Sequence, residues 1–140
     1  MTMISVVPTM LVRLMERFDS DPHGTEWPVS LRHILLGGAA ATPELLQECQ
    51  NRSLPVSTTY GLTEVGSQAV TLTPQDSAIK LAQGGTLGSV GKPLMFTQIR
   101  IVERDEEGAI VGKAPTDGHG EIVVRGPTVM QGYYLSLIHI

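Results

Sequence analysis

The chain is poor in cysteine, in aromatic side chains and in positive charge, and each scarcity excludes a class of protein. Cys49 is the one cysteine among 140 residues, so no disulfide can form within the chain, and a reducing, cytoplasmic setting is the simpler expectation. Aromatic residues make up 4% of the chain, so aliphatic side chains must fill its core. The net charge of -4 provides no basic surface for nucleic acid or an anionic membrane.

Long apolar runs and metal-binding spacings are missing as well. No apolar run reaches the roughly 18 residues of a membrane-spanning helix. Residues 1–15 lack the basic start and the continuous apolar stretch of a signal peptide. We therefore expect a soluble chain without a membrane span. The histidines are scattered without the short spacing of a metal site, so we expect structural or surface roles for them. They are His23, His33, His119 and His139.

The first half of the chain alternates predicted helices and strands. Apolar residues recur every three to four positions over residues 8–18, with a proline at the first turn, which predicts a helix. Short strands are predicted over 32–36 and 55–60. Between them, Thr42 is a good N-cap for a second helix. This alternation predicts an α/β layer over residues 1–74.

The pattern changes after about Pro74, where helix signals fade and glycines multiply. Three short runs alternate apolar and polar residues and are predicted strands: 97–103, 109–111 and 121–125. The stretch 105–108 has the composition of a hairpin turn between the first two. Residues 75–134 are therefore predicted to be β-rich.

The stretch 57–64 places an aromatic ring, a hydroxyl and a carboxylate close together after a predicted strand. Tyr60 offers a flat face for a purine, a threonine hydroxyl can bond a phosphate oxygen, and Glu64 can hold the cation that accompanies a triphosphate. Gly61 lets the backbone turn sharply beside a ligand. Open α/β sheets bind small molecules at this end of their strands. Residue chemistry alone leaves a polar loop as the alternative.

Residues 85–92 have some features of a phosphate-binding P-loop but fail its pattern. That pattern requires a glycine five residues before the Gly-Lys pair and a serine or threonine after it. Thr86 and Pro93 occupy those positions. We interpret the stretch as a turn-rich entry to the β-rich half.

Several motifs, taken in order and at their spacing, resemble the adenylate-forming superfamily of acyl-CoA synthetases, luciferases and peptide-synthetase adenylation domains. Besides 57–64, these motifs are 34–39, 120–126 and 132–134, and the resemblance covers residues 1–134. Within the superfamily, three stretches resemble the 2-succinylbenzoate-CoA ligases of menaquinone synthesis: 4–11, 35–39 and 88–94.

This resemblance implies a fold and a reaction. The fold is α/β: a fragment of the large N-terminal domain of an adenylate-forming enzyme, in which an α/β layer precedes a β-rich, barrel-like portion. In the parent reaction a carboxylate attacks the α-phosphate of ATP, releases pyrophosphate and leaves an acyl adenylate. The thiol of coenzyme A then displaces AMP. The implied ligands are ATP or AMP, Mg²⁺, coenzyme A and a small carboxylate, of which 2-succinylbenzoate is the expected one.

The resemblance also implies roles for individual residues. Glu64 binds the magnesium that bridges the phosphates and Thr63 contacts the α-phosphate, so these two are the predicted catalytic residues. The predicted nucleotide-binding residues are Gly37, Gly38, Ala39, Thr59, Tyr60, Gly61 and Thr63. Among them, Tyr60 stacks beside the adenine.

Two parts of this assignment have structural alternatives. The turn 37–39 lets the backbone approach the adenine and the acyl group, but it is equally well explained as the entry to the helix capped by Thr42. Ser67 and Gln68 face the acyl pocket or begin a strand.

Some family elements have no counterpart in this sequence: the upstream phosphate loop, the ribose-binding aspartate and the mobile C-terminal domain with its lysine. Residues 135–140 do not match the family and are expected to be a non-matching tail. We therefore expect the fragment to be inactive alone and to self-associate through apolar side chains such as Met10, Leu14 and Phe18. Two alternatives stay open: another acyl- or aryl-CoA ligase, or a non-catalytic truncated partial domain.

Overall fold

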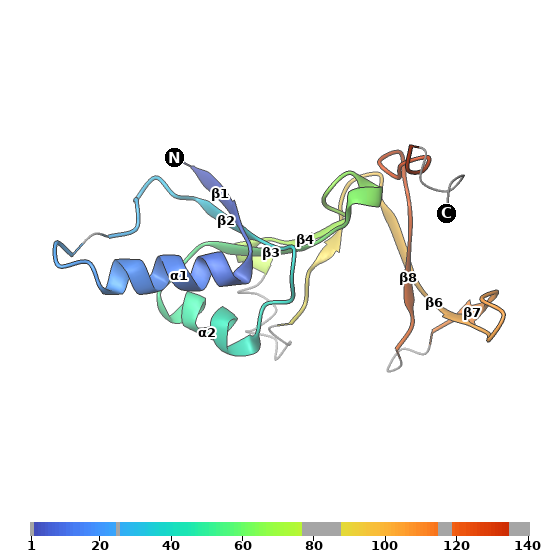
Figure 1. The fold of residues 1–140 in the computed structure, drawn as a ribbon, viewed down its shortest axis with the longest axis horizontal. Coiled ribbons are helices and arrows are strands. Elements are labelled where there is room, and N and C mark those ends of the chain that lie inside the picture. Colours follow the sequence, from blue (N-terminus) through green and yellow to red (C-terminus); the bar gives the residue numbers. More distant parts are fainter. Residues whose placement is uncertain (1, 25, 77–87, 115–118, 135–140) are drawn as a thin grey trace. The chain divides into compact units, whose positions relative to one another are not determined.

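The structure is a computed structural model that describes residues 2–24, 26–76, 88–114 and 119–134. The chain forms two compact units, which are coloured along the sequence in Figure 1. The first contains Met1–Gly61 and Val70–Lys92, and the second contains Leu62–Ala69 and Pro93–Ile140. The tail 135–140 and residues 85–87 of the predicted turn-rich stretch 85–92 lie outside the described residues.

The first unit is an α/β layer, as predicted. Its elements in order are β1 (Met3–Val6), α1 (Pro8–Asp19), β2 (His33–Leu36), α2 (Pro43–Asn51), β3 (Val56–Tyr60) and β4 (Val70–Leu72). The strands pair in the order β1-β2-β3-β4, with the short β5 (Lys92–Pro93) next. β1, β2 and β3 are parallel and β4 is antiparallel to β3. The carboxyl ends of β2 and β3 therefore meet at one edge of the sheet.

Both helices cover the same face of this sheet, below it in Figure 1. The buried core joins α1, α2 and the first two strands: Val6, Leu11, Met15, Leu31, Ile34, Leu36, Leu46 and Cys49. Ile34 and Leu36 are two residues apart on β2, so their side chains point to this one face. At the start of α2, the Thr42 hydroxyl accepts a hydrogen bond from the Leu45 N–H at 3.2 Å, which confirms the predicted cap.

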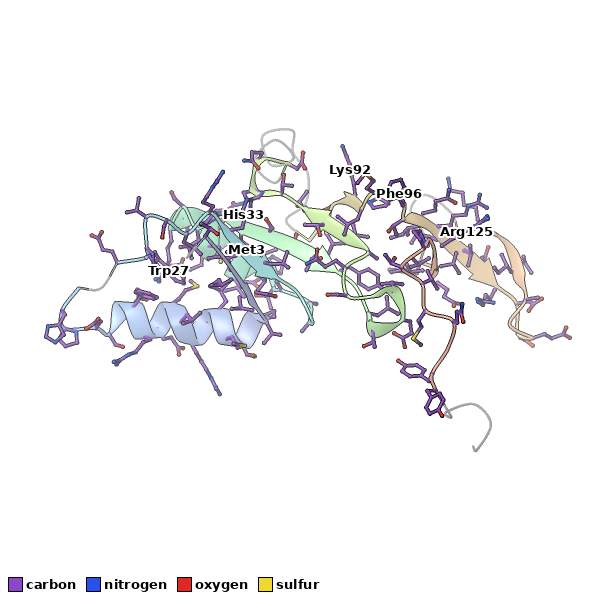
Figure 2. The ribbon with its side chains drawn as sticks, turned by 90° about the horizontal axis from the view of Figure 1, so that it is seen from above. Met3, Trp27, His33, Lys92, Phe96 and Arg125 are labelled. Atoms are coloured by element: carbon purple, nitrogen blue, oxygen red, sulfur yellow. The ribbon has the colours of Figure 1, made fainter. Side chains whose placement is uncertain are left out.

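One prediction about α1 is largely wrong. Leu14 and Phe18 were expected to be exposed, but Leu14 packs against the core and the Phe18 ring stacks on Trp27. The two ring centroids are 4.5 Å apart and the planes are inclined by 25°. Trp27 lies beside α1 in Figure 2. Trp27 comes from the segment after α1, and its ring covers the end of that helix. Met10 agrees with the prediction, because it is 51% exposed.

The second unit is β-rich. It begins with the single-turn 3₁₀ helix η1 (Thr63–Val65) and contains β6 (Gln98–Arg104), β7 (Ile110–Lys113) and β8 (Glu121–Arg125). These three strands form an antiparallel sheet in the order β7-β6-β8. Within the described ranges this sheet is open and no closed barrel is formed. An ion pair between Arg104 and Glu121 joins β6 to β8.

The turn between β6 and β7 is the predicted hairpin turn. The Asp105 carboxylate accepts hydrogen bonds from the N–H groups of Glu107 and Ala109, at 3.1 and 2.8 Å. Gly108 takes a positive φ of 83°, which the turn requires and glycine readily adopts. Among the described residues, no helix has the length and apolar character needed to cross a membrane.

Candidate functional site

In the first unit, the predicted residues lie at the edge where β2 and β3 end. Gly37 directly follows β2, and Thr59 and Tyr60 are the last two residues of β3. A Cβ at Gly37 would lie 2.5 Å from the Thr59 methyl carbon and 3.2 Å from the Thr59 carbonyl oxygen. The ends of the two strands thus approach so closely that a side chain at residue 37 would force Thr59 to shift.

Thr59 cannot easily move away from Gly37, because hydrogen bonds hold its side chain. The hydroxyl donates to the Val70 carbonyl oxygen at 2.8 Å and lies 3.1 Å from the Thr71 hydroxyl. Both partners are on the neighbouring β4. The Thr59 hydroxyl is therefore committed to the sheet, and what Thr59 presents at the edge is its methyl group and backbone.

The turn after Gly37 is also restricted. Gly38 has a φ of 78°, in the left-handed region, and a Cβ there would lie 3.1 Å from a methyl carbon of Val7. Three alanines, 39–41, lead from this turn to Thr42 and α2. The turn is thus an entry to the helix. Its small side chains also leave space at the sheet edge.

That space is a cavity of about 100 Å³. Its walls come from the turn after β2, from α2, from the end of β3 and from the stretch before β5: Leu36, Ala39, Ala40, Ala41, Leu46, Thr58, Thr59, Gly88 and Val90. Ligand pockets commonly measure about 300–1,000 Å³. The cavity can therefore take a small apolar group or part of a ring system, and a whole nucleotide would extend beyond it. Thr58 was not among the predicted site residues.

In the second unit, Thr63 and Glu64 open the 3₁₀ turn. Leu62 before the turn is extended, and Gly66 after it is left-handed with a φ of 71°. Val65 is buried and anchors the turn, so the turn has a defined shape. Ser67 and Gln68 come between this turn and β4, which begins at Val70, so the alternative that they start a strand is wrong.

Two hydrogen bonds fix Glu64. Its backbone carbonyl oxygen accepts from the Met130 N–H at 2.8 Å, and its carboxylate Oε1 accepts from the Tyr133 hydroxyl at 2.8 Å. The hydrogen bond from the Tyr133 hydroxyl is the largest cause that lowers the pKa of this carboxyl, and the backbone N–H of Glu64 lowers it further. The same bond raises the pKa of Tyr133. Glu64 is thus an anion at neutral pH. Within the described part of the chain, its second oxygen, Oε2, has no hydrogen-bond partner.

A carboxylate of this kind suits a magnesium ion. Mg²⁺ keeps several waters and is commonly bound by one or two carboxylates together with substrate phosphates. The described residues contain no cluster of three or more histidine, cysteine or acidic side chains that could hold a metal by themselves. Among the described residues, Glu64 is therefore suited to a metal ion that is also bound by the phosphates of a substrate.

The structure thus brings the predicted residues together in two groups. Gly37, Gly38, Ala39, Thr59 and Tyr60 gather at the sheet edge of the first unit. Thr63 and Glu64 share the turn of the second, with Gly61 just before it in the sequence.

Sequence reasoning did not assign a role to Tyr133 or Met130. Tyr133 is 69 residues from Glu64, and no local pattern signals a contact at that separation. The second unit has a hollow of about 380 Å³ that contains none of the predicted residues. Its lining residues are Phe96, Gln98, Arg125, Gly126 and Pro127.

Comparison with known proteins supports the resemblance inferred from the motifs. The 2-succinylbenzoate–CoA ligase of Bacillus velezensis is 47% identical over 133 residues, which are 95% of this chain and 24% of that protein. Two solved structures of o-succinylbenzoate CoA synthetase from Bacillus subtilis match as well, one in complex with the acyl-adenylate intermediate OSB-AMP and one with ATP and magnesium ion. Each has a TM-score of 0.73 at 42% identity, and the match covers 96% of this chain and 24% of that one.

The chain therefore spans about a quarter of the length of the curated relatives that it matches, and it aligns along nearly its whole own length. The model of the AMP-binding enzyme family covers residues 1–134. The resemblance to adenylate-forming enzymes, and within them to 2-succinylbenzoate-CoA ligases, is confirmed. The chain belongs to the AMP-binding enzyme family.

Proposed function

We propose that this chain is part of the N-terminal domain of an ATP-dependent acid–CoA ligase. The enzyme would activate a carboxylate as its acyl adenylate and then transfer the acyl group to coenzyme A. The proposed acid is 2-succinylbenzoate, in menaquinone synthesis. The observation that carries the proposal is 47% identity to a 2-succinylbenzoate–CoA ligase over 95% of the chain. A cytoplasmic location belongs to the proposal and agrees with the single, buried cysteine.

The proposed roles follow from the chemistry of the residues. The first step of such a ligase asks little covalent chemistry of the protein, because catalysis depends on positioning and on neutralising phosphate charge. Glu64 supplies an ionised carboxylate for Mg²⁺, and the bound ion would offset charge on the triphosphate. The Thr63 hydroxyl would donate to an α-phosphate oxygen. The solved structure of the Bacillus subtilis synthetase with ATP and magnesium ion supports this ligand class.

The sheet edge of the first unit would receive the flat parts of the ligands. Tyr60 offers a half-buried ring beside which an adenine could stack. Gly37 and Gly38 carry no side chain, so a ligand can come close to the backbone there. The apolar cavity beside Ala39 and Thr59 would take part of the adenine or of the acyl group.

The direct test is calorimetric titration of the purified chain with ATP in the presence of magnesium. We expect saturable binding that is weaker by about tenfold or more in Glu64→Gln, because the variant keeps the side-chain shape and loses the charge that holds the ion. Glu103→Gln is the matched control, since Glu103 is an exposed carboxylate on β6 of the same unit. A folded chain that binds no ATP would contradict the proposal that these residues carry a nucleotide site.

Two further measurements address the finer parts of the proposal. We expect the 140-residue chain alone to form no thioester, because it spans 24% of the ligase that it resembles. A full-length enzyme that carries this sequence should prefer 2-succinylbenzoate among a panel of aromatic and aliphatic acids. Equal rates with other acids would favour the alternative, a different acyl- or aryl-CoA ligase.

A further inference from the structure

The segment that ends in Tyr133 braces the turn that carries Glu64. Besides the two hydrogen bonds from Met130 and Tyr133, this segment closes its own turn through the Val129 N–H, which donates to the Gly126 carbonyl oxygen at 3.2 Å. All of these residues belong to the second unit. Two points of the segment, one on its backbone and one on a side chain, thus contact the same glutamate.

The packing around Gly66 adds a further close approach between this segment and the turn that carries Glu64. A Cβ at Gly66 would lie 3.5 Å from the Thr128 carbonyl oxygen, so the backbone of the segment runs alongside the turn. Val65 is 3% exposed, so a buried side chain also anchors the turn. The backbone of Glu64 is therefore fixed between a buried anchor and the segment 126–133, and the orientation of its side chain depends on one remaining contact, the Tyr133 hydroxyl.

A tyrosine hydroxyl has suitable chemistry for holding a metal-binding carboxylate. It is a neutral donor, so it orients the carboxylate without cancelling the negative charge that attracts a cation, as a lysine or arginine would. It occupies Oε1 only, and Oε2 has no partner within the described part of the chain. A flexible glutamate would otherwise lose side-chain freedom when the ion binds.

We propose that Tyr133 is a positioning residue for Glu64, and that its hydroxyl holds the carboxylate with Oε2 available to a magnesium ion bound to a nucleoside triphosphate. This inference rests on the proposed function, because it assumes that Glu64 is the magnesium ligand. It adds a residue that touches neither the metal nor the nucleotide and acts through Glu64 alone.

The test compares Tyr133→Phe with Tyr134→Phe by titration with ATP, once with magnesium and once with EDTA. Tyr134 is the matched control, because it is the neighbouring tyrosine and is 92% exposed. We expect Tyr133→Phe to weaken binding of magnesium–ATP by about tenfold, the scale of one hydrogen bond to a charged group, and to leave binding of metal-free ATP unchanged. Tyr134→Phe should match the wild type in both titrations.

A second readout is independent of nucleotide. In a carbon-13 NMR titration of the Glu64 carboxyl, Tyr133→Phe should raise the pKa towards the ordinary value for glutamate, and Tyr134→Phe should not. Loss of the fold in Tyr133→Phe would move many resonances, whereas loss of positioning would move those of Glu64 and its neighbours. An unchanged Glu64 pKa in a folded Tyr133→Phe variant would overturn the inference.

Glu64→Gln separates the inference from the proposed function. If Glu64→Gln weakens magnesium–ATP binding and Tyr133→Phe behaves like Tyr134→Phe, the positioning role is overturned and the proposed function stands. If Glu64→Gln has no effect, Glu64 is not the magnesium ligand, and its proposed role and the positioning role of Tyr133 are both overturned. In the Glu64→Gln background, Tyr133→Phe should weaken binding no further, because a residue that acts through Glu64 has no effect once that carboxylate is lost.

Discussion

The contact between Gly37 and Thr59 shows how one residue sets the geometry of the sheet edge. Because the Thr59 hydroxyl is bonded to Val70 and faces the Thr71 hydroxyl, its methyl group cannot rotate away from an added Cβ without breaking those bonds. Overpacking of this kind commonly costs about 1–3 kcal/mol. The edge of the first unit therefore owes its close backbone approach to a specific pair of residues.

We accordingly predict that Gly37→Ala lowers the free energy of unfolding by about 1–3 kcal/mol. Urea denaturation followed by circular dichroism measures the change. Gly112→Ala on β7 is the control, because no atom lies within 4 Å of an added Cβ there, and its effect should stay within about 0.5 kcal/mol. Equal stabilities of the two variants would mean that β2 and β3 do not approach each other as described.

The sequence indicated the types of residue at the site but not their partners. A strand that ends in an aromatic residue, followed by a glycine and a carboxylate, pointed to residues 59–64, and the assignment of Thr63 and Glu64 as ligand residues stays a prediction. The bond between Tyr133 and Glu64 could not be inferred, because it depends on how β8 and the following segment return to the turn. Contacts of this kind are set by tertiary packing, which local patterns do not contain.

At the scale of elements, the Thr42 cap fixes where α2 begins. Its hydroxyl satisfies the N–H of Leu45, one of the first backbone donors of a helix that have no partner within it. We predict that Thr42→Ala lowers the free energy of unfolding by about 1 kcal/mol, and that Thr42→Ser, which keeps the hydroxyl, has a smaller effect. Urea denaturation of the three proteins compares them. Equal losses in both variants would show that the cap hydroxyl contributes little.

Elements that carry a clear period, or that end at a glycine turn as β2 does, were predictable, whereas β1 and β4 were not. The helix predicted over 8–18 is α1, which ends one residue later, and the strand predicted over 121–125 is β8. β1 and β4 have four and three residues, too few to establish an alternation. β1 is stabilised by its pairing with β2, and β4 by its pairing with β3, so these two strands depend on neighbours that are distant in the sequence.

An ion pair links the carboxyl ends of α1 and α2. Both nitrogens of the Arg52 fork donate to the Asp19 carboxylate, at 2.6 and 2.9 Å, and Arg52 also bonds Glu48 at 2.7 Å. The hydrogen bond from Arg52 lowers the pKa of Asp19 below its ordinary range. Because the folded pKa lies below the unfolded one, this contribution to stability is complete above the unfolded pKa of about 3.9 and is lost as the pH falls through the folded pKa.

We therefore predict that Asp19→Asn has a lower urea midpoint than the wild type at pH 7, by a small margin because the pair is largely exposed. The margin should shrink as the pH falls below about 4, where the wild-type carboxyl also becomes neutral. Denaturation at a series of pH values measures it. A margin for Asp19→Asn that is constant down to pH 2.5 would contradict the prediction.

At the scale of the whole molecule, apolar surface is unevenly distributed between the two sheets. The sheet of the first unit is covered on one face by α1 and α2. The described part of the second unit contains the 3₁₀ turn η1 but no α-helix, and all four residues of β7 are exposed. Ile101 and Ile122 are directly opposite each other on β6 and β8 and are 38% and 41% exposed. Opposite residues share a face of the sheet, so these two form a continuous apolar surface.

Exposed apolar sheet surface and an unpaired edge strand both promote association, so we predict that the isolated chain self-associates through this sheet rather than through α1. Sedimentation velocity should show an average mass that rises with concentration. Ile101→Thr combined with Ile122→Thr should reduce this rise, because threonine keeps a high strand propensity and removes apolar area. Val29→Ser is the control, since Val29 is fully exposed in a loop of the first unit. A wild-type chain that stays monomeric at every concentration would contradict the prediction. Equal association of the double variant and the control would show that another surface forms the contact.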